Sequence, residues 1–425
     1  MPIWRVCGGN TLNGSVRVQG AKNAVLPILA GCLVRGGVTV LENCPALLDV
    51  DASVEILRHL GCRVMQNGGE ILVDSRTMSE NRIPHSLMLK MRSSVTYMGA
   101  ILARCGEVCL SAPGGCELGS RPIDLHLEAL QALGAEVEQR GGEVLCRTTG
   151  LRGAHINLRF PSVGATENVM LAACAAEGTT VLTNAAMEPE IADLQEFLCG
   201  CGAEIHGAGS PEIYIEGMKP VPETRHRILP DRIAAASYLC AAAAAGGEIC
   251  LSDTRPEQLA TVLSALKEMG CGIVVDGEHI RLRRSGPLRA PRPVITRPYP
   301  GFPTDAQALL MAPCLKAEGT SVFVENIFDN RFRHCEEFAR LGAEIRVEGR
   351  VAMISGVSRL TAAPMAATDL RGGAAMIAAA LSAEGESSMI DSGHVARGYA
   401  DLAPTLRALG ADVRLENDPP EQTME

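Results

Sequence analysis

Six copies of one pattern run through the 425 residues, and this repetition limits the possible fold more than any other feature. A phrase of apolar residue, glycine, small residue, any residue and Val or Ile recurs every 68 to 73 residues, with its glycines at Gly61, Gly134, Gly202, Gly270, Gly342 and Gly410. Each copy also holds a helical run, a strand such as "GTTVLTN", a loop, a second helix such as "IDLHLEALQALG" and another strand. Units of this length exceed ordinary solenoid repeats, so we predict an α/β fold with two domains of three units each.

The domain limits follow from where the pattern breaks. We place them at the Gly20-Ala21-Lys22 phrase and at the Pro-containing "RILPDR", residues 227–232. The first domain then covers 22–230, the second combines 1–21 with 231–418, and 419–425 form a solvated tail. Because the chain crosses twice between domains, we expect a hinged pair around a cleft.

Composition excludes several classes of partner. A formal charge of −10 argues against nucleic acid and anionic membranes. The amino terminus lacks a signal-peptide pattern, and no apolar run approaches the roughly 18 residues of a membrane span. Sixteen cysteines without an export signal favour a reducing compartment, and no C-x2-C pair suggests zinc. We therefore expect a cytoplasmic protein without a metal; the sequence does not address its oligomeric state.

Polar residues recur where the first helix of each unit is predicted to begin. These starts are Lys22-Asn23, Arg92, Ser162-Val163-Gly164, Asp231-Arg232, Thr304-Asp305 and Asp369-Leu370-Arg371. The aspartates are also explained as ordinary N-caps. The cations oppose the helix dipole at its amino end, which favours an anionic ligand there.

The loop after each strand is a second equivalent position. It carries Cys116 and Arg121 in the second unit, Glu188 in the third, Arg331 in the fifth and Arg397 in the sixth. Scattered surface arginines and an inert buried cysteine are the alternatives. Recurrence at equivalent positions favours a local positive field for a small anionic substrate, and the glycines before Cys116 favour a loop that approaches a ligand.

At these positions the sequence resembles the UDP-N-acetylglucosamine enolpyruvyl transferases (1-carboxyvinyltransferases) of the EPSP synthase superfamily. The matching phrases include "GAKNAVLPIL", "KMRSSV", "APGGCELGSRPIDLH", "PSVGATENVML", "NAAMEPEI", "LPDRI", "GFPTDAQ", "FDNRFRH", "ATDLR" and "ARGY". The resemblance implies two inside-out α/β barrels, in which strands surround buried helices.

The chemistry implied by the resemblance is enolpyruvyl transfer from phosphoenolpyruvate to the sugar 3′-hydroxyl of UDP-N-acetylglucosamine, the first committed step of peptidoglycan synthesis. The reaction passes through a tetrahedral ketal, releases phosphate and needs no cofactor. Asp305 matches the base and Cys116 the proton donor, which the epoxide fosfomycin is expected to alkylate. Lys22, Asp369 and Arg397 complete the implied catalytic set.

The resemblance also implies the substrate-binding residues. Phosphoenolpyruvate is expected at Lys22, Arg121 and Arg397, with Arg92, Arg331 and Arg371 close by. The nucleotide sugar is expected at Asn23, Arg121, Pro122, Ile123, Asp124, Leu125, Ser162, Val163, Gly164, Glu188, Asp305 and Ile327.

Four positions depart from the common family pattern. Ala234 and Ala396 replace carboxylates, Thr96 replaces an aromatic residue and Tyr299 replaces a histidine. These departures leave open a paralogue that uses another UDP-sugar, or a scaffold that has lost turnover. The intact proton-transfer residues argue against the scaffold.

Overall fold

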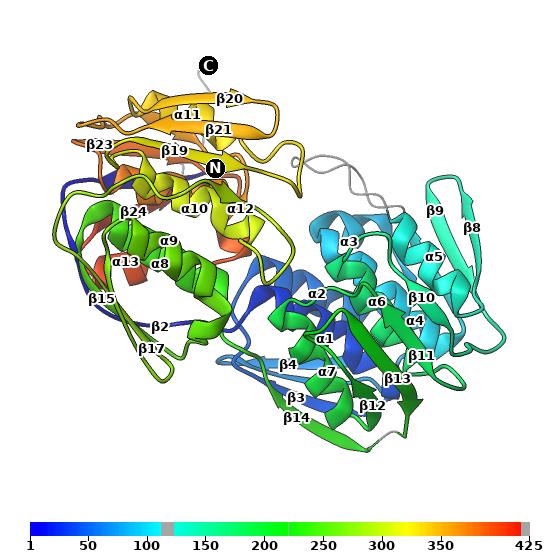
Figure 1. The fold of residues 1–425 in the computed structure, drawn as a ribbon. Helices are drawn as coiled ribbons and strands as arrows, with labels where there is room; N and C mark the ends of the chain where they lie inside the picture. The colour runs from blue at the N-terminus through cyan, green and yellow to red at the C-terminus, as the bar shows by residue number, and fades with distance from the viewer. Residues whose placement is uncertain (112–122, 220, 418–425) are drawn as a thin grey trace. The chain divides into compact units, whose positions relative to one another are not determined.

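The computed structural model describes residues 1–111, 123–219 and 221–417, apart from the side chains of Arg92 and Asn417. The described chain forms two compact units (Figure 1). The first unit comprises 20–111 with 123–229, and the second comprises 1–19 with 230–417.

The first unit contains three four-stranded sheets, ordered β14-β3-β5-β4, β6-β7-β9-β8 and β10-β11-β13-β12. Its strands are β3 (Val38–Glu42), β4 (Arg63–Asn67), β5 (Glu70–Asp74), β6 (Arg82–Ile83), β7 (Glu107–Ser111), β8 (Glu136–Arg140), β9 (Glu143–Arg147), β10 (His155–Asn157), β11 (Thr180–Thr183), β12 (Ala203–His206), β13 (Glu212–Met218) and β14 (Glu223–Arg227). Its helices are α1 (Lys22–Arg35), α2 (Leu48–His59), α3 (His85–Lys90), a 3₁₀ turn (Arg92–Thr96), α4 (Tyr97–Cys105), α5 (Asp124–Ala132), α6 (Val163–Ala173) and α7 (Pro189–Gly200).

The second unit repeats this plan with the sheet orders β16-β17-β15-β2, β18-β19-β21-β20 and β22-β23-β1-β24. Its strands are β1 (Pro2–Cys7), β2 (Leu12–Arg17), β15 (Gly247–Ser252), β16 (Gly272–Asp276), β17 (His279–Arg284), β18 (Val294–Ile295), β19 (Thr320–Val324), β20 (Glu344–Glu348), β21 (Val351–Ser355), β22 (Pro364–Ala366), β23 (Glu386–Ile390) and β24 (Asp412–Asn417). Its helices are α8 (Arg232–Ala245), a 3₁₀ turn (Pro256–Leu259), α9 (Ala260–Glu268), α10 (Thr304–Cys314), α11 (His334–Arg340), α12 (Leu370–Ala380), a 3₁₀ turn (Val395–Arg397) and α13 (Leu402–Ala408).

Every sheet contains one parallel strand pair and two antiparallel pairs. The parallel pairs are β14/β3, β6/β7, β10/β11, β15/β2, β18/β19 and β22/β23. The amino-terminal β1 lies inside the last sheet, where Trp4 pairs with Met389 on one side and Leu415 on the other. The amino-terminal segment therefore completes the second unit.

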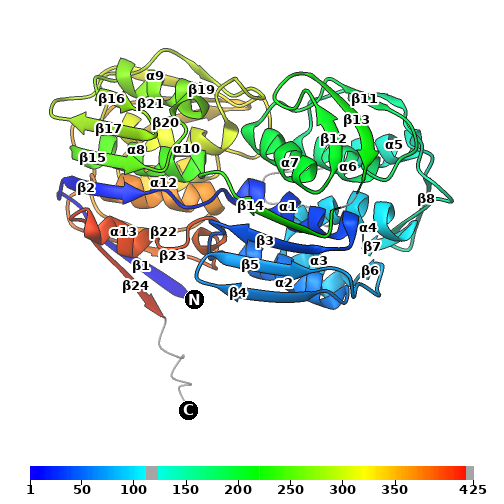
Figure 2. The same ribbon diagram turned by 90° about the horizontal axis from the view of Figure 1, so that it is seen from below.

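The central helices explain why the chain contains so much alanine. In the second unit α8, α10 and α12 pack against one another, and the sheet strands lie around them (Figure 2). All residues of α8 from Arg232 to Ala244 are buried, and small side chains let such helices approach closely. Helices inside and strands outside confirm the fold class expected from the sequence.

The six repeated glycines mark one structural position. Each lies two residues beyond the second helix of its unit, and their φ angles run from +89° to +103°. Residues with a Cβ are strained in this left-handed region, so the repeat requires glycine there.

Candidate functional site

A buried cluster of two aspartates and two arginines lies at the helix starts of the second unit. Arg331, in the loop after β19, places Nη2 3.0 Å from Asp305 Oδ1 and Nη1 3.7 Å from Asp369 Oδ1. Arg371 Nε lies 3.4 Å from Asp305 Oδ2. Three separate stretches of sequence thus meet at Asp305, as equivalent positions in a repeat predict.

Asp305 and Asp369 occupy different positions relative to the starts of their helices. Asp369 is the N-cap of α12 and accepts hydrogen bonds from the backbone N–H groups of Arg371 and Gly372. Asp231 caps α8 in the same way, so the capping alternative is confirmed for both. It is wrong for Asp305, which is the second residue of α10, because Pro303 occupies the capping position.

Burial and charge act against each other in this cluster. Burial raises the pKa of Asp369, but the Arg331 guanidinium and the Gly372 N–H outweigh it, so the pKa lies below its ordinary value. Burial opposes the charge on Arg371, yet Tyr399 and Asp305 raise its pKa further above the ordinary value. Both arginine side chains are only 2% exposed, while that of Asp305 is 30% exposed. Asp369 and Arg371 therefore favour their charged forms, and the side chain of Asp305 is partly exposed to solvent.

Several buried polar atoms of the cluster have no hydrogen-bond partner among the described residues. They include Nε of Arg331 and both Nε and Nη1 of Arg371. Buried N–H donors are nearly always satisfied in native proteins. Arg371 Nε still lies 3.4 Å from Asp305, so ion pairs hold the two arginines in place although their hydrogen bonds are incomplete.

A neutral histidine lies behind the arginines and was not singled out in the sequence. Burial lowers the pKa of His334 to about 4, and its Nε2 lies 3.3 Å from the sulfur of Met311. Met311 also accepts a hydrogen bond from Gln307 Nε2 at 2.9 Å. A histidine inside a phrase such as "FDNRFRH" gives no signal that distinguishes a packed ring from a ligand.

Glu325 holds the loop that carries Ile327. Its side chain accepts hydrogen bonds from the N–H of Ile327 at 2.7 Å and of Phe328 at 3.1 Å. The hydroxyl of Thr304 donates to its other oxygen at 3.0 Å. The half-buried Ile327 is thereby fixed beside the start of α10. Sequence reasoning missed Glu325, although its place directly after a strand was the available signal.

Lys22 in the first unit is paired rather than solvated. Its Nζ lies 2.6 Å from Asp49 Oδ2, and the two side chains are 11% and 3% exposed. Lys22 and the exposed Asn23 are the first two residues of α1. Asp49, from the first turn of α2, is a second residue that the sequence did not reveal.

A hydrogen bond between His126 of α5 and Asn168 of α6 connects these two helices near their starts. A Cβ added to Gly164 would lie 3.0 Å from Cε1 of His126. Asn168 donates to His126 Nδ1 at 2.8 Å, and burial lowers the pKa of His126 to about 4. The predicted nucleotide residues Ile123, Asp124 and Leu125 on one side, and Ser162, Val163 and Gly164 on the other, begin these two helices.

Glu188 begins a group of carboxylates near α6. It occupies the N-cap position of α7, and Glu190 lies in the first turn of that helix. Burial raises the pKa of Glu167 in α6 to about 8; the Thr96 hydroxyl, 3.2 Å away, acts against this, while Glu190 and Glu188 reinforce it. Thr96, one of the departures from the family pattern, therefore supports a buried carboxyl group.

Part of the predicted site lies elsewhere or outside the described residues. Cys116, Arg121 and Pro122 fall outside the described ranges, and for Arg92 only the backbone at the start of its 3₁₀ turn is described. Arg397 is half-buried at the end of the 3₁₀ turn after β23.

The described chain contains neither a group of side chains suited to a metal ion nor a helix that could span a membrane. No His, Cys, Asp or Glu group suited to a metal ion occurs in it. No helix within the same ranges has the length and hydrophobicity to span a membrane.

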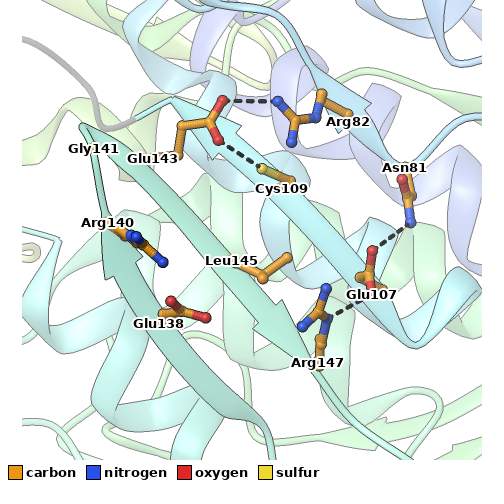
Figure 3. Close-up of a pocket in the computed structure, with 10 residues that line it drawn as sticks. All are labelled: Asn81, Arg82, Glu107, Cys109, Glu138, Arg140, Gly141, Glu143, Leu145 and Arg147. Atoms are coloured by element: carbon orange, nitrogen blue, oxygen red, sulfur yellow. Dashed lines mark hydrogen bonds and ion pairs between the residues drawn. The ribbon is translucent and has the colours of Figure 1, made fainter.

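A cavity of about 400 Å³ on the sheet of β6 to β9 contains none of the predicted residues (Figure 3). Its charges are paired with one another, Arg82 with Glu143 at 2.8 Å and Arg147 with Glu107 at 2.7 Å. Cys109 donates to Glu143 at 3.8 Å. Exposed pairs of this kind contribute little energy and leave no net charge for a ligand.

The fold agrees with the comparisons to known proteins. Residues 6–406 match the family described as EPSP synthase (3-phosphoshikimate 1-carboxyvinyltransferase). The chain belongs to this family, and the resemblance in its motifs is confirmed.

Curated relatives narrow the comparison. UDP-N-acetylglucosamine 1-carboxyvinyltransferase 2 of Caldanaerobacter subterraneus subsp. tengcongensis is 48% identical over 97% of this chain and 99% of its own. The UDP-N-acetylglucosamine 1-carboxyvinyltransferase of Halorhodospira halophila is 44% identical over 96% of this chain and 97% of its own.

Solved structures support the same fold. The enolpyruvyl transferase NikO of Streptomyces tendae superposes with a TM-score of 0.88 at 26% identity, covering 98% of this chain and 99% of its own. EPSP synthase of Acinetobacter baumannii, at 18% identity and a TM-score of 0.72, covers 98% and 100% and is similar in fold alone.

Proposed function

We propose that this chain is a UDP-N-acetylglucosamine 1-carboxyvinyltransferase. It transfers the enolpyruvyl group of phosphoenolpyruvate to the 3′-hydroxyl of UDP-N-acetylglucosamine and releases phosphate, the first committed step of peptidoglycan synthesis. The observation that carries the proposal is the match, at 44–48% identity over almost the whole chain, to relatives of that name. The cluster around Asp305 supports it because two positive charges are held beside a partly exposed carboxylate, which suits a reaction between an anionic substrate and a hydroxyl group.

In the addition step, Asp305 removes the proton of the sugar hydroxyl while the hydroxyl oxygen forms a bond to C2 of phosphoenolpyruvate. Cys116 delivers a proton to C3, which yields a tetrahedral ketal. A thiol with the ordinary pKa of about 8.5 is mostly protonated at pH 7 and can donate. In the elimination step C3 loses a proton, the C2–phosphate bond breaks and phosphate leaves with the bonding electrons. No cofactor takes part.

The cations neutralise the phosphate and carboxylate of phosphoenolpyruvate. Lys22, Arg121 and Arg397 are proposed as its direct ligands, and Arg92, Arg331 and Arg371 complete the positive field. Arg331 and Arg371 are rigid donors, because both are buried and fixed by Asp305. Preorganised donors of this kind stabilise charge that develops in the transition state.

The nucleotide is proposed to bind where α5 and α6 begin in the first unit. Ser162 caps α6 by accepting from the N–H of Ala165. The N–H groups of Val163 and Gly164 then remain for a diphosphate, as is typical of helix amino termini. The uridine is assigned to Arg121, Pro122, Ile123, Asp124 and Leu125. Asn23, Glu188 and Ile327 are assigned to the sugar.

A paralogue that uses another UDP-sugar is the second candidate. The replaced carboxylates at Ala234 and Ala396, together with Thr96, favour it. We propose a cytoplasmic location, where both soluble substrates are made, and no nucleic-acid or membrane partner.

Phosphate release tests the proposal. The purified chain is mixed with phosphoenolpyruvate and, in separate assays, with UDP-N-acetylglucosamine, other UDP-sugars or shikimate 3-phosphate. We expect release with UDP-N-acetylglucosamine at a kcat/KM that exceeds all the others. Faster release with another UDP-sugar establishes the paralogue, and no release with any acceptor establishes the scaffold.

A further inference from the structure

The loop that carries Arg397 is fixed on its amino-terminal side by Asp391. This buried residue directly follows β23, and its side chain accepts hydrogen bonds from the next backbone N–H groups. Gly393 donates at 3.0 Å, His394 at 2.7 Å and Val395 at 3.2 Å. The 3₁₀ turn that ends at Arg397 therefore starts from a defined backbone position.

Gln19 fixes the same loop on its carboxy-terminal side. Its side-chain Nε2 donates to the carbonyl of Gly398 at 3.1 Å, and its Oε1 accepts from the N–H of Ala400 at 3.1 Å. One amide side chain thus supplies the donor and the acceptor that a neighbouring strand would supply. Tyr399, between these contacts, bonds Ser237 through its hydroxyl at 2.6 Å.

Gln19 is itself fixed to a buried helix. Its backbone carbonyl accepts from the N–H of Asp231 at 2.8 Å, and Asp231 is the N-cap of α8. Gln19 is also the last residue of the amino-terminal segment in the second unit. The Gln19 side chain therefore connects the Arg397 loop to α8, in addition to the bond between Tyr399 and Ser237.

The backbone is held on both sides of Arg397. Asp391 binds the residues before it, and Gln19 binds the residues after it. Ala396, next to Arg397, is exposed and has no polar side chain. The position of the Arg397 backbone therefore depends on Asp391 and Gln19.

We propose that Gln19 is a positioning residue for Arg397. Its amide fixes residues 398–400 so that the Arg397 guanidinium meets the anionic groups of phosphoenolpyruvate. The proposal rests on the function proposed above, since it assigns Gln19 to the phosphoenolpyruvate side of that reaction and not to the nucleotide side.

Steady-state kinetics with both substrates test the proposal. Gln19→Met keeps the length of the side chain and removes both hydrogen bonds. We expect KM for phosphoenolpyruvate to rise about tenfold, the scale of one to two lost hydrogen bonds, while KM for UDP-N-acetylglucosamine stays within about twofold. Asn13→Ala is the matched control, because Asn13 lies in β2 and accepts from the N–H of Glu248 at 3.1 Å, and it should change neither KM.

Gln19→Glu adds a second measurement, the pH dependence of KM for phosphoenolpyruvate, which should not change if Gln19 has only a structural role. Ionised glutamate accepts from Ala400 but repels the Gly398 carbonyl, whereas protonated glutamate donates to it. The KM for phosphoenolpyruvate, relative to wild type, should fall as the assay pH is lowered from about 8 toward the ordinary glutamate pKa of about 4.3.

Two results separate the possible failures. A Gln19→Met variant with the wild-type KM for phosphoenolpyruvate, or with both KM values raised equally, overturns the positioning role. A wild-type protein that releases no phosphate from phosphoenolpyruvate overturns the proposed function instead.

Discussion

At the scale of single residues, the sequence suggests a set of functional groups, but it does not show which of them touch. Asp305, Arg331, Asp369 and Arg371 are recognisable from their equivalent positions in the repeats. Their shared contacts depend on loops of different lengths, and no local pattern encodes those contacts. Partners such as Glu325 escaped notice because a glutamate after a strand is common in solvated turns.

Asp305→Asn tests the proposed base. Asparagine keeps the size of the side chain and one acceptor for Arg331, so the fold should persist. Loss of the base should lower kcat by about 10²–10⁴-fold, the range for general base catalysis. Asp329→Asn is the control: this exposed carboxylate, in the loop that carries Arg331, pairs with Arg350, and its loss should leave kcat unchanged. A wild-type kcat for Asp305→Asn would remove Asp305 from the proton transfer.

At the scale of elements, the repeat predicted helix starts and the turn glycines, because both depend on local backbone conformation. It predicted less well how helices of different units pack. The packing of His126 against Gly164, for example, joins residues far apart in sequence, and the glycine at position 164 is its only sign in the sequence.

Gly164→Ala measures that packing. The new Cβ would lie 3.0 Å from the buried His126 ring, which is held in place by its hydrogen bond with Asn168. Overpacking of this kind costs about 1–3 kcal/mol, whereas alanine gains at most about 1 kcal/mol of helix propensity. We therefore expect the free energy of unfolding, measured by urea titration, to fall by up to about 2 kcal/mol. Gly150→Ala, whose Cβ meets open space, should be neutral or slightly stabilising; equal effects of the two changes would contradict the packing argument.

The buried Glu167 of α6 predicts a pH dependence of stability. Its pKa is raised to about 8 in the folded state from 4.5 as an ordinary value, chiefly by burial, so the folded state holds the proton more tightly. Its contribution is complete below about pH 4.5 and is lost as the pH rises toward 8, at no more than about 1.4 kcal/mol per pH unit.

Glu167→Gln removes this titration and keeps an acceptor for Thr96. Relative to wild type, the variant should gain about 1–3 kcal/mol in the free energy of unfolding between pH 6 and pH 8, measured by urea titration at each pH. The exposed Glu138→Gln controls for the change of charge and should show no such trend. A constant difference across the pH range would show that Glu167 is ionised throughout.

At the scale of the whole molecule, the number of repeated units, the fold class and the family could be predicted from the sequence. The reason is that the same sequence pattern occurs six times, and each copy predicts the same α/β unit. The domain limits at 22–230 and at 1–21 with 231–418 stay a prediction for the folding units. The expected cleft depends on the placement of one domain against the other, and a pattern that repeats within each domain holds no information about it.

Selective alkylation of Cys116 is a prediction about the whole set of sixteen cysteines. Burial raises the pKa of most described thiols, for example those of Cys44 and Cys62 to about 12, and so suppresses their reactive thiolates. Exposed Cys105 and Cys199 are the competitors within the described ranges. With fosfomycin and UDP-N-acetylglucosamine present, mass spectrometry should find one adduct, on the peptide that contains Cys116, together with loss of phosphate release. Cys116→Ala should remove both the adduct and most of the turnover, whereas Cys199→Ala should retain both. An adduct on Cys105 or Cys199 would mean that exposure alone, and not the loop around Cys116, determines reactivity in this protein.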